Sequence, residues 1–257
     1  MTAADKLTSI YHAIARAADE DKSFVNFDLG LAPEAMTDMN ALKVREISEY
    51  SNFGETNLLR NDIARFLESQ GNAPDLSGRV ADVLDQVAKD AISATHAEAA
   101  FFTLRGFTPI DEFNVPRWHT DGWFYEPTEN TSQKKIALTL KGPKTLLNNL
   151  PDSLREVFHK LLRSFQSDTT ENRRTLEKLV NPADTQIPLP GQGTIFTVGD
   201  IEHSAVHSEP PIDSERLFMS VVPGTRAQIE ELRQRWNVPP TTYSLAPVPP
   251  PQGPQMP

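Results

Sequence analysis

The segment "PRWHTDGWFY" at residues 116–125 places His119 and Asp121 two positions apart among aromatic residues. On a β-strand, residues i and i+2 point to the same face about 7 Å apart, so an imidazole and a carboxylate at this spacing can converge on one ion. The pair therefore predicts two of the three ligands of a 2-His-1-carboxylate site, which leaves positions open on Fe(II). A third ligand has to come from elsewhere in the chain.

The segment "GDIEHSAVHSEPPIDSERLFMSVV" offers His203 and His207 as the third ligand. A helical H-x-x-x-H zinc site of the protease kind needs a glutamate directly after the first histidine, but Ser204 stands there. Two following prolines also prevent a long helix. On a strand the two histidines lie roughly 13 Å apart, too far to bind one metal together without a bend. We therefore expect only one of them to be a ligand.

The composition narrows the possible chemistry. The 257-residue chain has no cysteine, which excludes disulfides, zinc thiolate sites and iron–sulfur clusters and leaves nitrogen and oxygen ligands for a metal. A net charge of -10 and the lack of a run of basic residues argue against nucleic acid as a partner. The sequence shows neither a signal peptide nor a stretch of about twenty apolar residues, so we expect no membrane association and a cytoplasmic location.

The first 98 residues are expected to form a helical N-terminal region packed on the core, because apolar residues recur there at helical spacing. These stripes are expected to face a core and not a cofactor. They consist of Leu58, Leu59, Ile63, Phe66 and Leu67, and of Val80, Val83, Leu84, Val87, Ala91 and Ile92.

A β-rich core is expected over residues 99–224. Short apolar runs bounded by glycine, proline and acidic residues predict its strands: "AAFFTLRGF", "KKIALTLKG", "GTIFTVGD" and "RLFMSVV". Between the second and third runs, "DSLREVFHKLLRSFQ" has an apolar face at helical spacing and predicts a helical insert over 151–181. His159 on this segment is expected to be an ordinary helix residue, as are His12 and His96 elsewhere.

The C-terminal part divides into two segments. The run "RAQIEELRQRW" predicts a short helix over 225–237. Eight of the 21 prolines fall within the last nineteen residues, so 238–257 is expected to be an extended, disordered tail. Such a tail is a spacer, or it binds a partner that has a proline-binding groove.

The motifs "RWHTD" and "HSEPPIDSERLFMS" resemble the H-x-D…H…R pattern of the Fe(II)/2-oxoglutarate-dependent dioxygenase superfamily, over about residues 99–224. In that superfamily the H-x-D opens a double-stranded β-helix, and an arginine about ten residues after the distal histidine binds 2-oxoglutarate. The resemblance thus implies this role for Arg216, which lies nine residues after His207 and thirteen after His203. His207 is accordingly preferred as the distal ligand, and His203 remains the alternative.

Arg216 also has a physical rationale. A guanidinium offers a planar fork to a carboxylate, and an arginine in the apolar run "RLFMSVV" needs a reason to point inward. The competing interpretation is an ion pair with Glu209 or Asp213 at the edge of the strand. The resemblance further implies that Thr145, in "KIALTLKGPKTLL", offers a hydroxyl to the co-substrate.

The aromatic residues around the first two ligands allow two interpretations. Trp118, Trp123, Phe124 and Tyr125 could shape a substrate pocket or simply pack the barrel. Asp121 is more informative, because halogenating members of the superfamily replace this carboxylate with a small residue. The resemblance therefore implies an enzyme of the hydroxylase type.

The expected fold is α+β, with a double-stranded β-helix (jelly-roll) core, N-terminal helices and a helical insertion. The implied function is that of an oxygenase that uses Fe(II) and 2-oxoglutarate to oxidise a C–H bond of a small-molecule or peptide substrate. One alternative is a cupin-like metalloenzyme that does not use 2-oxoglutarate, in which Arg216 would face away from the metal. Another is a non-catalytic β-barrel binding module in which the histidines are structural.

Overall fold

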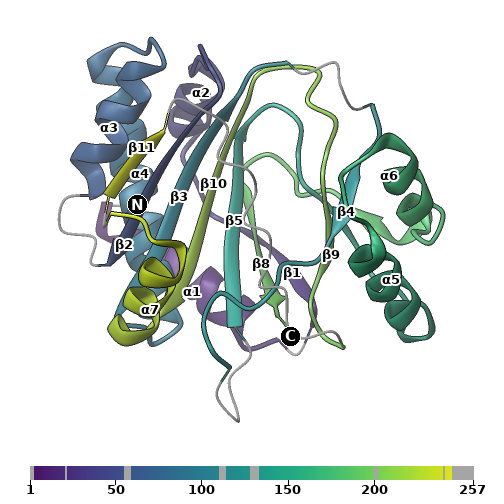
Figure 1. Ribbon diagram of the computed structural model, residues 1–257. Helices are drawn as coiled ribbons and strands as arrows, with labels where there is room; N and C mark the ends of the chain where they lie inside the picture. Colours follow the sequence, from purple (N-terminus) through teal and green to yellow (C-terminus); the bar gives the residue numbers. More distant parts are fainter. Residues whose placement is uncertain are drawn as a thin grey trace.

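The computed structural model describes residues 3–20, 22–54, 59–109, 114–127, 133–199, 202–239 and 241–244. In these ranges the chain forms an α+β structure with two antiparallel sheets and helices on their outer faces (Figure 1). The large sheet has the spatial order β1 (Phe24–Asp28), β8 (Gln192–Val198), β5 (Gln133–Lys141), β10 (Arg216–Gly224), β3 (Ala99–Phe107), β2 (Ser48–Gly54) and β11 (Thr241–Ser244). The small sheet has the order β4 (Arg117–His119), β9 (Val206–Glu209), β6 (Leu146–Asn148) and β7 (Thr185–Gln186).

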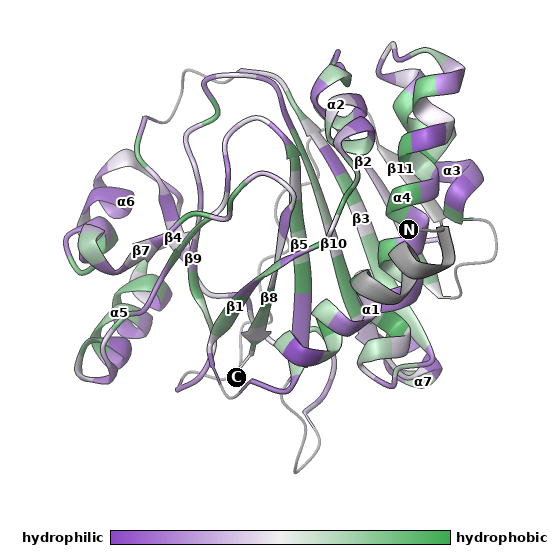
Figure 2. Cartoon of the chain, turned by 180° about the vertical axis from the view of Figure 1, so that it is seen from behind, coloured by the Kyte–Doolittle hydropathy of each residue, from purple (hydrophilic) through white to green (hydrophobic). Residues whose placement is uncertain are grey.

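Helices cover one face of the large sheet (Figure 1). The alternating residues Leu217, Met219 and Val221 of β10 point to this face, where they join a core that includes Leu84, and all four are fully buried. Much of β5 and β10 is accordingly coloured hydrophobic in Figure 2. Truncation of Leu84 to alanine should cost about 2–5 kcal/mol of folding free energy. The covering helices are α1 (Ala3–Ala18), α2 (Pro33–Ala41), α3 (Leu59–Ser69) and α4 (Pro74–Ala94).

Local signals set the ends of two helices. Helix α4 begins with Pro74 in its first turn, where the missing N–H of proline costs nothing. Helix α7 (Arg226–Trp236) begins with a capping box, in which Thr225 and Gln228 bond each other's backbone N–H. It ends at Asn237, whose φ of 51° is left-handed. Helix α7 packs on β2, β3 and β10. It lies on the inner face of the large sheet, which is the face opposite the one that α1 to α4 cover.

The inner face of the large sheet is more polar than the outer face. Along β10, Arg216, Phe218 and Ser220 alternate with the core residues, and Ser220 forms a 2.7 Å hydrogen bond with Thr103 of β3. Along β5, Lys135 points to the same inner side as the neighbouring Phe196 of β8, since its ammonium lies over that ring. This polar surface is the part of the fold that can support chemistry.

Two helices within the expected insert cover the outer side of the small sheet: α5 (Asp152–Ser164) and α6 (Thr170–Glu177) (Figure 1). Their apolar residues Phe158 and Leu176 form a core cluster with Trp118 of β4 and Val206 of β9. The insert is followed by a 3-10 turn (Pro182–Asp184) that leads into β7. It therefore supports the two strands that carry the candidate metal ligands.

The N-terminal region is not wholly helical, which corrects the expectation for 1–98. Strands β1 and β2 come from this region and pair with β8 and β3 of the large sheet. Their aromatic residues point to opposite faces: Phe24 and Phe53 face one core cluster, whereas Phe27 and Tyr50 face the other. Because both faces are buried, the strands lack the polar–apolar alternation that reveals a strand in a sequence.

Part of the expected disordered tail is ordered. Residues Thr241–Ser244 form β11, which pairs with β2 at the edge of the large sheet. The run "TTYS" supplies β-branched and aromatic residues that suit a strand, and its position at the sheet edge tolerates the neighbouring prolines. The proline-rich residues 245–257 lie outside the described residues, as does any partner site on them. No helix in the described ranges is long and apolar enough to cross a membrane.

Candidate metal centre

Strands β4 and β9 bring two histidines together in the small sheet. The antiparallel register pairs His119 directly with His207, and their ring centroids lie 4.3 Å apart. His207 is 5% exposed, so this part of the small sheet faces the interior. The strand pairing explains why two residues far apart in the sequence meet at one point.

Asp121 completes the cluster from just beyond the end of β4. Its Oδ1 lies 3.9 Å from Nε2 of His119, and its Oδ2 lies 3.7 Å from Nε2 of His207. The spacing predicted that Asp121 lies on the same strand as His119, but β4 ends at His119 and Asp121 lies in the loop that follows. A 2.9 Å hydrogen bond from the Gly199 N–H to the Asp121 carbonyl holds the loop instead. The candidate ligand atoms of the three residues all lie within 4.8 Å of one another.

The hydrogen bonds of the two histidines fix their tautomers. Nδ1 of His119 donates to the Arg117 carbonyl at 2.9 Å, and Nδ1 of His207 donates to the Ala205 carbonyl at 3.0 Å. A carbonyl only accepts, so each ring carries its proton on Nδ1 and has a lone pair on Nε2. This is the arrangement in which a histidine binds a metal through Nε2.

The environment keeps the cluster in the protonation state that a metal needs. Burial lowers the pKa of His119 well below its usual value, and His207 and Arg117 lower it further. Burial also lowers the pKa of His207, although Asp121 opposes the shift. Burial alone would raise the pKa of Asp121, but Lys135 and the two histidines outweigh it and the pKa lies below the usual value. At neutral pH the cluster thus holds two neutral imidazoles and one carboxylate.

The three residues fit a divalent transition metal. Two atoms bonded to one ion at about 2.1 Å can be at most about 4.2 Å apart. The His119–Asp121 and His207–Asp121 separations of 3.9 Å and 3.7 Å already fall within this limit. Two nitrogen donors and one oxygen donor suit Fe(II) and related ions, and they leave the remaining coordination positions free.

Arg216 is buried beside Thr145, the other residue that the resemblance assigns to the co-substrate. Its Nη2 donates to Thr145 Oγ1 at 3.1 Å, and its Nε donates to the Pro143 carbonyl at 3.0 Å. Nη1 lies 3.9 Å from Oε1 of Glu209, so part of the alternative ion pair is present too. Burial lowers the pKa of Arg216 to about 10, and the guanidinium is therefore still charged at neutral pH.

A small cavity lies between the metal cluster and Arg216. One of its walls is Phe196, whose ring lies 4.8 Å from that of His207, and another is Phe218, whose ring lies 4.7 Å from the Arg216 guanidinium. The cavity has a volume of about 10 Å³, which is about the size of one water molecule. A keto acid that spans from the cluster to Arg216 has to widen it by moving side chains such as Gln192.

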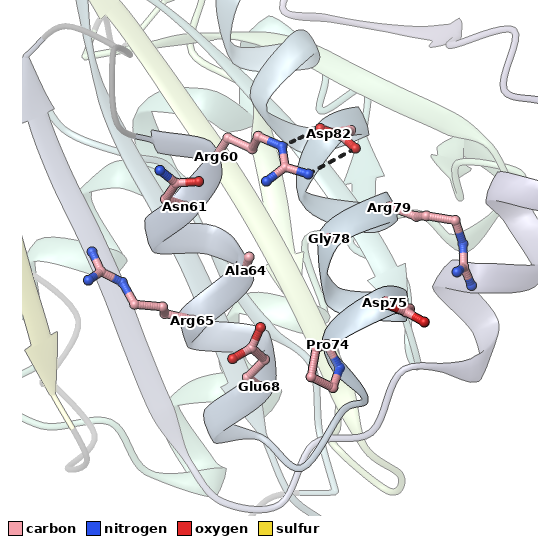
Figure 3. A pocket seen from close by; sticks show the side chains of 10 residues that line it. All are labelled: Arg60, Asn61, Ala64, Arg65, Glu68, Pro74, Asp75, Gly78, Arg79 and Asp82. Atoms are coloured by element: carbon pink, nitrogen blue, oxygen red, sulfur yellow. Dashed lines mark hydrogen bonds and ion pairs between the residues drawn. The ribbon is translucent and has the colours of Figure 1, made fainter.

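A much larger hollow lies on the far side of the helices. It is a groove of about 780 Å³ between α3 and α4, and it contains none of the metal-cluster residues (Figure 3). Two of its arginines are already paired, Arg60 with Asp82 across the groove and Arg79 with Asp38 of α2 at 2.7 Å. We therefore place the functional site at the cluster and not in this groove.

The remaining candidates lie away from the cluster. His203 is exposed in the turn before β9, whereas His159 is buried on α5 against Phe158. Most of the aromatic residues near Asp121 serve packing: Trp118 joins the core under α5 and α6, and Phe124 and Tyr125 join the core between the sheets and α7.

Trp123 has a different role. It packs so closely on Gly199 that a Cβ at this glycine would lie 2.2 Å from the indole ring. The contact and the Gly199 hydrogen bond to Asp121 together hold the loop that carries the carboxylate.

The sequence reasoning missed Lys135. Its Nζ lies 2.7 Å from Oδ2 of Asp121, which makes it part of the cluster. The run "KKIALTLKG" begins with two lysines, which suggests the exposed start of a strand. The usable signal was the alternation of β5, because Ile136 and Leu138 face the helices and the odd-numbered residues must face inward.

Comparisons with known proteins give structural neighbours only. No protein-family model matches the sequence, and no curated protein matches it. Similar solved structures include a Pseudomonas putida prolyl-4-hydroxylase, with 11% identity, a TM-score of 0.40, and coverage of 84% of this chain and 94% of that chain. They also include the dioxygenase for auxin oxidation 1 of Arabidopsis thaliana bound to 2-oxoglutarate, with 9% identity, a TM-score of 0.41, and coverage of 83% and 86%.

A third similar structure is an N-substituted L-amino acid dioxygenase from Burkholderia ambifaria AMMD. It has 18% identity and a TM-score of 0.39, and the match covers 84% of this chain and 86% of that chain. Likenesses at this level do not carry a function from one protein to another, so the chemistry has to be inferred from the cluster itself. A prolyl-4-hydroxylase and two dioxygenases, one of them solved with 2-oxoglutarate, are thus among the structures similar to this chain, which itself has a candidate His–Asp–His metal site.

Proposed function

We propose that the protein is an Fe(II)- and 2-oxoglutarate-dependent oxygenase that hydroxylates a C–H bond of a small-molecule or peptide substrate. The observation that carries the proposal is the cluster of His119, Asp121 and His207, with both Nε2 atoms turned to the carboxylate. Fe(II) and 2-oxoglutarate would supply the oxidation by dioxygen, with succinate and carbon dioxide as co-products. The protein would supply the ligand geometry and orient both acids.

We further infer that the two sheets form the double-stranded β-helix of such enzymes. The small sheet lies against the inner face of the large sheet, as the contact of His207 on β9 with Phe196 on β8 indicates. At the other end of the cavity, Arg216 of the large sheet donates to Thr145, which lies just before β6 of the small sheet. The inferred barrel therefore encloses the cluster at one point and the arginine at another.

In this proposal Arg216 binds the distal carboxylate of 2-oxoglutarate. Its guanidinium is buried and charged, and a planar fork can donate two parallel hydrogen bonds to a carboxylate. Thr145 holds the fork by accepting from Nη2 and can add its own hydroxyl as a donor to the acid. Phe196 and Phe218 border the path between the two ends, where they would exclude water from the acid.

The proposal is tested by adding 2-oxoglutarate to the Fe(II)-loaded protein without oxygen and recording the visible spectrum. A keto acid chelated to Fe(II) gives a weak visible charge-transfer band, so we expect this band in the wild-type protein. His207→Ala should abolish it. His203→Ala is the matched control, because this exposed histidine lies only four residues earlier, and its band should be unchanged. A wild-type protein that binds Fe(II) but gives no band contradicts the proposal.

A second candidate is a metalloenzyme on the same fold that does not use 2-oxoglutarate. Two observations favour it: Glu209 lies 3.9 Å from Arg216, and the cavity between cluster and arginine is only about 10 Å³. In such an enzyme Glu209 would remain the partner of Arg216. Glu209→Gln distinguishes the candidates, because it should tighten 2-oxoglutarate binding if Glu209 competes with the acid for the arginine. If 2-oxoglutarate is not a ligand of the protein, Glu209→Gln should still show no detectable binding of 2-oxoglutarate.

A further inference from the structure

A partly buried cation, Lys135, lies within the cluster, and the proposed chemistry does not use it. Lys135 is 12% exposed, and its Nζ donates to Oδ2 of Asp121 at 2.7 Å. The ammonium also lies over two aromatic rings, 5.7 Å from the centroid of Phe124 and 5.5 Å from that of Phe196. Lysine is almost never buried unless it is paired, because removing its charge from water is costly.

The hydrogen bonds of Lys135 are incomplete. An ammonium has three N–H donors, and in the described part of the chain Asp121 is its one hydrogen-bonded acceptor. The rings of Phe124 and Phe196 attract the charge through their faces, but they do not replace an oxygen acceptor. The N–H donors that do not contact Asp121 are therefore available to an incoming anionic oxygen beside this carboxylate.

The charges of the cluster favour an anion as well. Asp121 and Lys135 cancel each other, and a histidine that binds a metal is neutral, so a divalent metal would keep both of its positive charges in this low-dielectric surrounding. A carboxylate oxygen has more than one lone pair, so the contact with Lys135 does not prevent Asp121 from binding the metal. A negatively charged ligand on the metal would therefore be bound more tightly here than a neutral one.

We propose that Lys135 binds the carboxylate of the organic acid that coordinates the metal. In this role its ammonium connects Oδ2 of Asp121 with a carboxylate oxygen of the acid. The identification of that acid as 2-oxoglutarate rests on the proposed function, whereas binding of a carboxylate at Lys135 requires only that the cluster holds a metal. The carboxylate can belong to a chelating 2-oxo acid or to a substrate that does not chelate.

The adjacent Lys134 provides a matched control. It precedes Lys135 on β5 but points to the opposite face, where its Nζ donates to Thr197 Oγ1 at 3.0 Å. Lys134→Met thus removes the same charge from the same strand without touching Asp121. A difference between the two methionine variants reports on the position of the ammonium and not on the net charge of the protein.

The experiment uses the full-length protein loaded with Co(II), whose visible spectrum changes when a ligand binds to the metal. Pyruvate is titrated as a 2-oxo acid with only a metal-binding end, and acetate as an acid that does not chelate. A hydrogen bond to a charged group corresponds to roughly a tenfold to hundredfold change in dissociation constant. Lys135→Met should therefore weaken pyruvate binding at least about tenfold while Co(II) stays bound, and Lys134→Met should leave it unchanged within about twofold.

The two acids identify the source of the carboxylate. Weaker pyruvate binding in Lys135→Met assigns Lys135 to the 2-oxo acid, and weaker acetate binding alone assigns it to an acid that does not chelate. Unchanged binding of both acids, with Co(II) bound, overturns the proposal. If Lys135→Met does not fold, Lys135→Gln allows the same comparison, because glutamine keeps an N–H donor for Asp121 and removes the charge.

Failure of this inference can be separated from failure of the proposed function. Arg216→Ala should weaken 2-oxoglutarate but not pyruvate, because pyruvate lacks the distal carboxylate. If 2-oxoglutarate binds no more tightly than pyruvate and Arg216→Ala alters neither, the proposed co-substrate is wrong. The effect of Lys135→Met on pyruvate still decides the role of Lys135 in that case.

Discussion

His119 and His207 face each other across β4 and β9, and each ring donates through Nδ1 to the carbonyl two residues before it in its own chain segment. This repeated contact gives both rings the same tautomer and turns both Nε2 atoms toward Asp121. Backbone carbonyls thus orient both imidazoles so that each Nε2 is available to a metal.

The first prediction concerns the metal ligands. Loss of a residue that only orients a metal ligand typically costs tenfold to hundredfold in affinity, so loss of a ligand itself should cost at least about hundredfold. His119→Ala, Asp121→Ala and His207→Ala should each weaken Fe(II) binding by this amount, measured by anaerobic titration. His203→Ala should have no effect. Loss of affinity in His203→Ala with retention in His207→Ala would show that the distal ligand is wrongly assigned.

The second prediction concerns the arginine. Removing one partner of a buried charged pair costs about 2–5 kcal/mol, so Arg216→Ala should weaken 2-oxoglutarate at least about 30-fold. Arg216→Lys should restore only part of the affinity, because an ammonium keeps the charge but lacks the planar fork. Fe(II) affinity should not change in either variant. An unaltered dissociation constant for 2-oxoglutarate in Arg216→Ala would favour the metalloenzyme that does not use the acid.

The third prediction is a loss of stability in mild acid. The folded-state pKa values of His119 and His207 are lowered by burial, whereas unfolded histidines titrate near about 6.5. Below about pH 6.5 the unfolded chain binds more protons than the folded chain. The contribution of the two histidines to the free energy of unfolding is therefore fully present above this pH and is lost as the pH falls. The loss is at most about 1.4 kcal/mol per pH unit for each histidine.

Urea denaturation of the metal-free protein at pH 7 and pH 5.5 measures this effect. The double variant His119→Gln/His207→Gln removes both titrating rings and should show a smaller loss of stability between the two pH values. An equal loss in the double variant and the wild-type protein would mean that other groups cause the acid sensitivity.

The fourth prediction concerns the loop that carries Asp121. Gly199 has a φ of +88°, and an added Cβ would lie 2.2 Å from Trp123. Gly199→Ala should therefore combine backbone strain of about 1–2 kcal/mol with overpacking of about 1–3 kcal/mol, and it should weaken Fe(II) binding by displacing the loop.

Gly191→Ala is the matched control for this variant. Gly191 has a similar φ of +81°, but the nearest atom to an added Cβ is the flexible Met36 side chain at 3.2 Å. This variant should show the strain alone and keep its Fe(II) affinity. Equal effects of the two substitutions on Fe(II) binding would contradict the role assigned to the Trp123 contact.

The candidate ligands could be named from the sequence for two reasons, a local spacing and the resemblance. The two-residue spacing of His119 and Asp121 and the distance from His207 to Arg216 are visible without a structure. The α+β character was predictable from local patterns as well, since helical stripes and short apolar runs occupy different parts of the chain.

The missed features depend on long-range contacts. Lys135 lies on β5, but it meets Asp121 because a loop held by Gly199 places the carboxylate there, and no local pattern shows this contact. Three strands are defined by their pairing with distant segments: β1 pairs with β8, β2 with β3, and β11 with β2. In addition, residues of β1 and β2 are buried on both faces of the sheet. Pairing between distant segments and burial on both faces leave no periodic signal in a single sequence.

A crystal structure of the protein with Mn(II) and 2-oxoglutarate tests the proposed site most sharply, because anomalous scattering locates the metal. We expect one Mn(II) bound by His119, Asp121 and His207, with the distal carboxylate of the acid on Arg216. Metal bound at another position, or an acid that does not contact Arg216 while Glu209 remains its partner, would contradict this expectation.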